Sequence, residues 1–157
     1  MKFSVVLAAI FTLFFVPNAA LANGSMLRIE GMDGKAVEFS IKDLDDLPQT
    51  SFETSTIWTD EDVVFSGVSL SALLQAAEVS GTTLRMTALN DYAVDMPMSE
   101  IGDDYPIVAT RMDGAVMPIR DKGPFWVVFP YDAASSFRSE TAYARSVWQL
   151  SLLSVIK

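Results

Sequence analysis

The chain has 157 residues, with 11 basic and 20 acidic side chains, a formal net charge of −9, and neither cysteine nor histidine. An acidic surface of this kind is unsuited to following a phosphate backbone, so nucleic acid is not an expected partner. The lack of cysteine and histidine excludes disulfides, cysteine nucleophiles, serine–histidine pairs and the usual zinc or copper ligand sets. Carboxylates, tyrosines, lysines and hydroxyl groups remain as chemically active side chains.

The first 22 residues have the pattern of a secretory signal peptide. Lys2 provides a positive start, residues 3–16 are almost wholly apolar, and Ala20-Leu21-Ala22 is a small-residue cleavage site. The apolar run is too short for a stable membrane span. We therefore predict an exported protein with one mature domain over residues 23–157, which is long enough to bury a core without disulfides.

The apolar patterns after the leader predict roughly nine short strands and two or three short helices. In chain order, the expected elements are strands 26–30 and 35–40, helix 41–47, an extended polar stretch 49–58, the apolar segment 63–65, helix 70–78, strands 83–88 and 92–96, a helical turn after Pro97, strands 105–111 and 115–119, strand 125–129 and a last strand 146–156. Gly67 is expected to break the apolar pattern before the helix that Ser69 caps. Because strands outnumber helices, the predicted fold class is α+β: a mixed, mainly β domain with a few short helices.

The most distinctive stretch is the apolar run over residues 125–129, which lies between two prolines. Such a run predicts a strand that is buried on both faces in the middle of a sheet. Pro130 is expected to end the ladder because it has no N–H to donate. Tyr131 and Asp132 follow, and an aromatic face beside a carboxylate suits a flat, nitrogen-rich ligand. An ordinary loop after a core strand explains the same residues.

Four motifs, taken in order, are similar to a known family. They are Phe65-x-Gly67-Val68-x-Leu70-x-x-Leu73-Leu74, Asn90-Asp91-Tyr92, Gly123-Pro124-Phe125-Trp126-Val127-Val128 and Arg145-Ser146-Val147-Trp148-x-Leu150. Together they resemble the oxidoreductase molybdopterin-binding domain of the sulfite oxidase family, and the likeness covers nearly the whole mature chain. The resemblance implies that family's fold and a pterin-shaped pocket.

One departure from the family concerns the metal. The resemblance implies a molybdenum-binding cysteine thiolate before the Gly67 motif, whereas this chain has Thr54-Ser55-Thr56-Ile57-Trp58-Thr59 there. A hydroxyl is a poor replacement for a soft thiolate, and basic residues for the cofactor's phosphate are few. We therefore expect a pterin as ligand, with no molybdenum and no cofactor bound as catalyst. No catalytic or metal-binding residue is assigned, and the chain is not expected to be an enzyme.

The chain is also similar to small exported pterin-binding proteins built on this fold. That resemblance implies a periplasmic sensor subunit that binds a free pterin and contacts the periplasmic domain of an inner-membrane receptor, a diguanylate cyclase or phosphodiesterase that makes or degrades cyclic di-GMP. Two alternatives stay open. One is a ligand-free protein-interaction subunit on a degenerate oxidoreductase fold, and the other is an enzyme, either a molybdopterin-related oxidoreductase or a glycosidase with paired carboxylates.

Stacking aromatics and hydrogen-bonding side chains are the expected parts of a pterin site. The candidates are Trp58, Asn90, Asp91, Tyr92, Asp121, Tyr131, Asp132, Arg145, Ser146 and Val147. The aromatic candidates occur where a strand meets a loop, although core packing also explains them. The amide and acidic candidates could bind the polar edge of the pterin. Turn formation also explains Asn90 and Asp91. The last three match the family's pterin-contacting segment, where Arg145 could bond a ring carbonyl or instead form a surface ion pair. Trp126 is expected in the core, and Trp148 within the last strand.

Overall fold

The computed structural model describes residues 24–157, so the predicted signal peptide lies outside the described residues. The strands are β1 (Leu27–Glu30), β2 (Ala36–Phe39), β3 (Gln49–Thr54), β4 (Val63–Ser69), β5 (Thr83–Ala88), β6 (Ala93–Pro97), β7 (Ile107–Met112), β8 (Ala115–Val116), β9 (Trp126–Val128) and β10 (Leu150–Val155). The helices are α1 (Ile41–Asp45), α2 (Leu70–Ala76) and α3 (Glu140–Ala144), with 3-10 turns at Met98–Glu100, Ile119–Asp121 and Ser135–Phe137. Among these described helices, none is long and apolar enough to cross a membrane.

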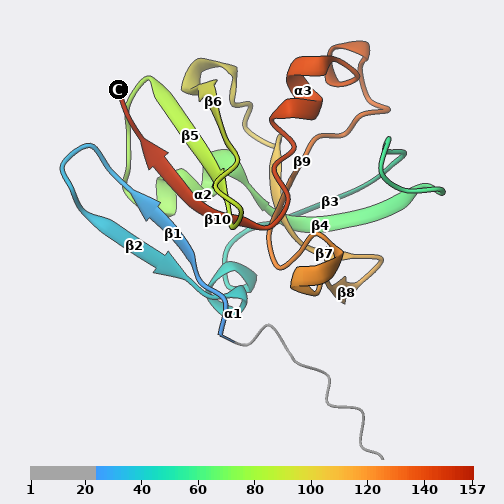
Figure 1. Cartoon of the computed structure of the whole chain (residues 1–157), viewed down its shortest axis with the longest axis horizontal. Coiled ribbons are helices and arrows are strands. Elements are labelled where there is room, and N and C mark those ends of the chain that lie inside the picture. Colours follow the sequence, from blue (N-terminus) through green and yellow to red (C-terminus); the bar gives the residue numbers. More distant parts are fainter. Residues whose placement is uncertain (1–23) are drawn as a thin grey trace, which may run out of the picture.

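The strands form two five-stranded sheets (Figure 1). The first has the order β2-β1-β10-β5-β6, in which β1 and β10 are parallel and the other pairs are antiparallel. The second has the order β3-β4-β7-β8, and β9 also pairs with β7. The C-terminal strand therefore lies in the middle of the first sheet, next to the N-terminal strand.

Local signals in the sequence account for the first elements. The Asp33-Gly34 turn joins β1 and β2 into the predicted hairpin, with Leu27 opposite Phe39. Ser40 caps α1 in a capping box: its hydroxyl accepts from the Asp43 N–H at 3.2 Å, and its own N–H donates to the Asp43 carboxylate at 2.8 Å. Both α1 and α2 end two residues before the predicted boundaries.

The prediction that Gly67 ends the apolar segment is wrong, because β4 runs through it from Val63 to Ser69. The register of β4 against β7 shifts between Ser66 and Gly67, as in a β-bulge. A Cβ at Gly67 would overlap the backbone oxygen of Val108 and lie 2.8 Å from the Ala109 Cα. Glycine therefore permits the close approach of β7 and does not break the strand.

The apolar run predicted as a central strand forms β9, and its residues are fully buried. In the ladder it pairs only with β7, so the predicted place in the middle of a sheet is only half correct. Further backbone bonds join this segment to the start of the last strand: the Val127 N–H donates to the Val147 oxygen, and the Leu150 N–H donates to the oxygen of Phe125, just before β9, both at 2.9 Å. β9 thus bonds to the chain that enters the first sheet.

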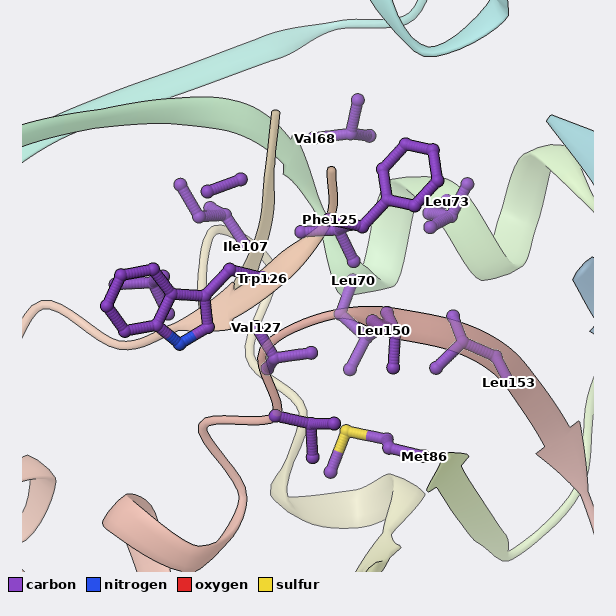
Figure 2. Close-up of a cluster of buried hydrophobic side chains, with 14 of the residues drawn as sticks. Val68, Leu70, Leu73, Met86, Ile107, Phe125, Trp126, Val127, Leu150 and Leu153 are labelled. Atoms are coloured by element: carbon purple, nitrogen blue, oxygen red, sulfur yellow. The ribbon is translucent and has the colours of Figure 1, made fainter. Parts of the chain in front are cut away.

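Side chains of both sheets meet around β9 (Figure 2). Phe125 and Val127 lie among Val68 and Ile107 from the second sheet and Leu150 and Leu153 from the first. The last strand begins at Leu150 and not at residue 146 as predicted, because Gln149 has a positive φ of 49° and the residues before it leave the ladder. These residues instead line the cavity described next.

Candidate ligand site

A cavity of about 280 Å³ opens at the end of the β5–β6 hairpin. It is lined by Trp58, Ala88, Asn90, Tyr92, Tyr143, Ala144, Ser146, Val147 and Trp148. These residues come from the loop after β3, the end of β5 and the turn that follows it, the end of α3, and the segment between α3 and β10. None of the lining side chains carries a formal charge, and the volume is near the lower end for a small-molecule site.

Hydrogen bonds hold the β5–β6 turn against the end of α3. Asp91 has a positive φ of 64°, and the Asn90 side-chain oxygen accepts from the Tyr92 N–H at 3.2 Å. The Tyr92 hydroxyl donates to the Ala144 oxygen at 2.8 Å. The Leu89 N–H also donates to the Gln149 oxygen at 2.9 Å, so two walls of the cavity are joined.

Trp58 is the centre of an aromatic cluster. Its ring lies edge-on to Trp126, Tyr131, Tyr143 and Trp148, with centroid distances of 5.8, 6.1, 5.8 and 5.7 Å. Edge-to-face pairs at this range are favourable beyond their buried area. Trp58 therefore connects the buried rings of Trp126 and Tyr131 to the exposed ring of Trp148 at the cavity.

A buried hydroxyl pair lies beneath the cavity. The Ser146 hydroxyl donates to the Ala142 oxygen at 2.8 Å, so the Tyr131 hydroxyl, 2.6 Å away, donates to Ser146. The Trp126 indole N–H donates to the Ser146 backbone oxygen at 3.2 Å. Burial raises the pKa of Tyr131 to about 12.

We expect Tyr131 to couple unfolding to alkaline pH. Because its folded pKa of about 12 exceeds the ordinary value of 10.0, its contribution to stability is complete below pH 10 and is lost as pH rises toward 12. The free energy of unfolding should fall by roughly 2 kcal/mol by pH 12 through this group. Urea unfolding between pH 9 and 12 measures the loss, and Tyr131→Phe should make the profile flatter. Equal slopes in the two proteins would contradict the assignment.

The cavity brings together half of the predicted site residues: Trp58, Asn90, Tyr92, Ser146 and Val147. Tyr131 is outside the lining, because its ring is buried behind Trp58 and Tyr143. Asp91 is exposed in the β5–β6 turn, and Asp121 is exposed in the 3-10 turn before β9, 3.6 Å from Arg120. A ligand-binding role for the five lining candidates stays a prediction.

The two remaining candidates are engaged by protein groups. The Arg145 guanidinium pairs with Glu100 at 2.6 Å, which is the ion-pair alternative considered for it. The Asp132 carboxylate accepts from the Ser55 N–H at 2.6 Å and from the Ser55 hydroxyl at 2.8 Å, and it also pairs with Arg138. The bonds from Ser55, followed by that from Arg138, hold the pKa of the Asp132 carboxyl well below its usual range.

Comparisons with known proteins agree with this architecture. A family model described as the oxidoreductase molybdopterin binding domain matches residues 15–136, which is most of the chain. The chain belongs to this family. Among solved structures, the sulfane dehydrogenase SoxCD from Paracoccus pantotrophus matches with a TM-score of 0.65 and 21% identity. The match covers 85% of this chain and 38% of the SoxCD chain.

The SoxCD likeness shows a shared fold, so the predicted mixed, mainly β fold of the molybdopterin-binding family is confirmed. No curated protein matches the chain. The matched residues of the family model end at 136, before the cavity segment that runs from Tyr143 to Trp148. Part of the cavity wall thus lies outside the matched portion of the molybdopterin-binding domain.

Sequence reasoning missed Tyr143, Trp148 and the two alanines as lining residues. Trp148 directly follows Val147 in the fourth motif, and its place beside a predicted site residue is the signal that could have placed it at the cavity. In the structure Val147 is buried and Trp148 is exposed. Tyr143 lies three residues before Ser146, on a helix whose pattern is too short to show a face. Its ring packs against Trp58 and Tyr131.

The residues present fit only part of the molybdopterin group that the family's description names. The chain has no cysteine to supply a thiolate, and residues 24–157 contain no cluster of three or more histidine, cysteine or acidic side chains for a metal. The lining also has no lysine or arginine for a phosphate. The aromatic and amide groups of the lining suit a flat heteroaromatic ring and offer no thiolate to molybdenum.

Proposed function

We propose that this molybdopterin-binding domain binds a free, unphosphorylated pterin and does not act as an enzyme. The observation that carries the proposal is the uncharged, aromatic lining of the cavity. A pterin ring is flat and neutral, so tryptophan and tyrosine faces can hold it without a counter-charge. A phosphorylated cofactor would leave its charge without a basic partner in this lining.

Unused donors at the cavity support a ligand with carbonyl and ring-nitrogen acceptors. The backbone N–H groups of Val147 and Trp148 donate no hydrogen bond to any residue of 24–157. The Asn90 side-chain oxygen is engaged by Tyr92, which leaves its amide N–H groups for a ligand. The Ser146 hydroxyl already bonds to Ala142 and Tyr131, so we assign it to the floor of the cavity and not to ligand recognition.

Titration with a panel of free pterins tests the proposal. We expect the mature protein to bind at least one member at a single site with micromolar or better affinity, measured by calorimetry and by quenching of tryptophan fluorescence. A pterin that differs only by a phosphate ester should bind more weakly, because no basic group lines the cavity. Absence of binding by every pterin, or equal binding of the phosphorylated form, would contradict the proposal.

We further propose that the protein works in the periplasm as a sensor subunit. Its partner would be the periplasmic domain of an inner-membrane diguanylate cyclase or phosphodiesterase, and the pterin would set the state of that receptor. Four large apolar side chains that line the cavity or adjoin a lining residue in sequence are exposed and could contribute to such a contact: Ile57, Leu89, Tyr92 and Trp148. A ligand changes partner affinity only if it binds the free and complexed proteins differently.

Cell fractionation and a receptor titration test this second step. The protein is expected in the periplasmic fraction, and the purified receptor domain should bind it with an affinity that changes when pterin is added. A cytoplasmic location would contradict export. Receptor binding that is the same with and without pterin would favour the alternative of a ligand-free interaction subunit.

A further inference from the structure

The loop that carries Trp58 is hydrogen-bonded to a distant part of the chain through one carboxylate, that of Asp132. β3 ends at Thr54, and Asp132 accepts hydrogen bonds from Ser55 through both its N–H (2.6 Å) and its hydroxyl (2.8 Å). Thr54 completes the contact, because its hydroxyl lies 3.2 Å from both the Asp132 carboxylate and the Asp132 N–H. Asp132 is 77 residues from Ser55 in the sequence, so this contact joins distant parts of the chain.

Arg138 fixes the carboxylate from the other side. Its guanidinium pairs with Asp132, and its Nε donates to the Tyr131 backbone oxygen at 3.1 Å. Arg138 therefore joins the two residues of the turn after β9, Tyr131 and Asp132, to the chain that follows. This arrangement gives Asp132 a fixed position although the residue is exposed to solvent.

Hydrogen bonds within the loop connect its anchored end to Trp58. The Thr56 hydroxyl accepts from the Trp58 N–H at 3.0 Å and lies 2.8 Å from the Thr59 hydroxyl, which donates to the Glu61 oxygen at 3.0 Å. Residues 55–61 are thus linked internally by short-range bonds. Apart from the aromatic contacts of Trp58, the side-chain hydrogen bonds that join this loop to distant parts of residues 24–157 all run to Asp132.

We propose that Asp132 is a positioning residue that holds the loop over residues 55–61 and thereby sets the Trp58 wall of the ligand cavity. The inference rests on the proposed function, because it gives Asp132 an indirect part in pterin binding. Asp132 itself is not among the residues that line the cavity. Its carboxylate stays ionised at neutral and mildly acidic pH, since its pKa lies below the usual range.

The test compares Asp132→Ala with Asp45→Ala in the full mature protein. Asp45 is a matched control, because its carboxylate also binds an arginine far away in sequence, Arg111, at 2.8 Å, but it lies outside the loop and the cavity. We expect Asp132→Ala to raise the hydrogen-exchange rate of the Ser55 amide about tenfold and to increase acrylamide quenching of tryptophan fluorescence. Asp45→Ala should change neither measurement.

Pterin affinity provides the second measurement. Asp132→Ala should weaken binding of the pterin selected in the panel about tenfold, with a thermal midpoint no lower than that of Asp45→Ala. Asp132→Asn keeps the side-chain volume and one acceptor oxygen, so it should give an intermediate loss and remains informative if the alanine variant folds poorly.

The outcomes separate this inference from the proposed function. Wild-type protein that binds no pterin would end the proposed function, while Ser55 exchange and quenching would still decide whether Asp132 holds the loop. The positioning role would be wrong if the wild-type protein binds pterin but Asp132→Ala and Asp45→Ala have the same Ser55 exchange rate and the same pterin affinity.

Discussion

Replacing Trp58 with alanine is expected to weaken pterin binding about 100-fold. Stacking of a base on an aromatic ring contributes about 1–3 kcal/mol, and 1.4 kcal/mol corresponds to a factor of ten. Trp58 also contacts both Tyr143 and Trp148, so its removal would take one packing partner from each of two other cavity rings. Calorimetric titration of the variant with the pterin selected by the wild-type protein measures the loss.

A matched aromatic variant separates this effect from general loosening. Phe52 is a half-buried aromatic of β3 that packs edge-on against Tyr105, with a centroid distance of 6.1 Å, and it lies outside the cavity lining. Phe52→Ala should lower stability and leave pterin affinity within about twofold of wild type. Wild-type affinity in Trp58→Ala, or an equal loss in both variants, would place the ligand elsewhere.

The largest effect on stability is expected for Gly67→Ala. β4 lies between β3 and β7 in the second sheet, and the added Cβ would meet the backbone of Val108 and Ala109. Backbone cannot move aside as the end of a flexible side chain can, so the strands must separate. Insertion of extra atoms into a packed site costs about 1–3 kcal/mol, occasionally more, and we expect about 3 kcal/mol here. Urea unfolding followed by circular dichroism measures the difference in midpoint.

Gly24→Ala is the control for this substitution. No heavy atom lies within 4 Å of a Cβ built at Gly24, so the exchange should leave the unfolding midpoint unchanged. A Gly67→Ala protein with wild-type stability would show that β7 tolerates displacement from β4, and the role assigned to the bulge would be wrong.

The sequence predicted those elements that depend on neighbouring residues. The β1–β2 hairpin follows from Asp33-Gly34, and α1 follows from the Ser40 capping box, because both signals act within a few residues. Gly67 misled the prediction because its function depends on the approach of Val108, about 40 residues further along the chain. Hydrophobic period predicts which face of a strand is buried but not which chain pairs with its edge. The bonds that join the β9 segment to residues 147–150 could therefore not be predicted from the sequence.

Prediction of the site residues has the same limit, because it also depends on contacts between residues distant in sequence. Trp58 was identified because a large aromatic in a polar stretch is conspicuous. Asp132 and Arg145 were assigned to the ligand, yet their partners are Ser55 and Glu100, which lie far away in sequence. A carboxylate or guanidinium has the same letter in the sequence whether it faces a ligand or another side chain. Only the tertiary arrangement distinguishes the two.

The backbone bonds that join residues 125–127 to residues 147–150 have a consequence for how the cavity can adapt to a ligand. Val127 and Phe125 bond to Val147 and Leu150 through backbone, so the floor of the cavity cannot shift unless hydrogen bonds of the core break. The opposite wall is attached through the side chain of Asp132. The two sides of the cavity are therefore held differently, one by backbone hydrogen bonds and the other by side-chain contacts. We therefore expect a ligand larger than the cavity to be accommodated on the Trp58 side, where side-chain contacts and not backbone hydrogen bonds would have to change.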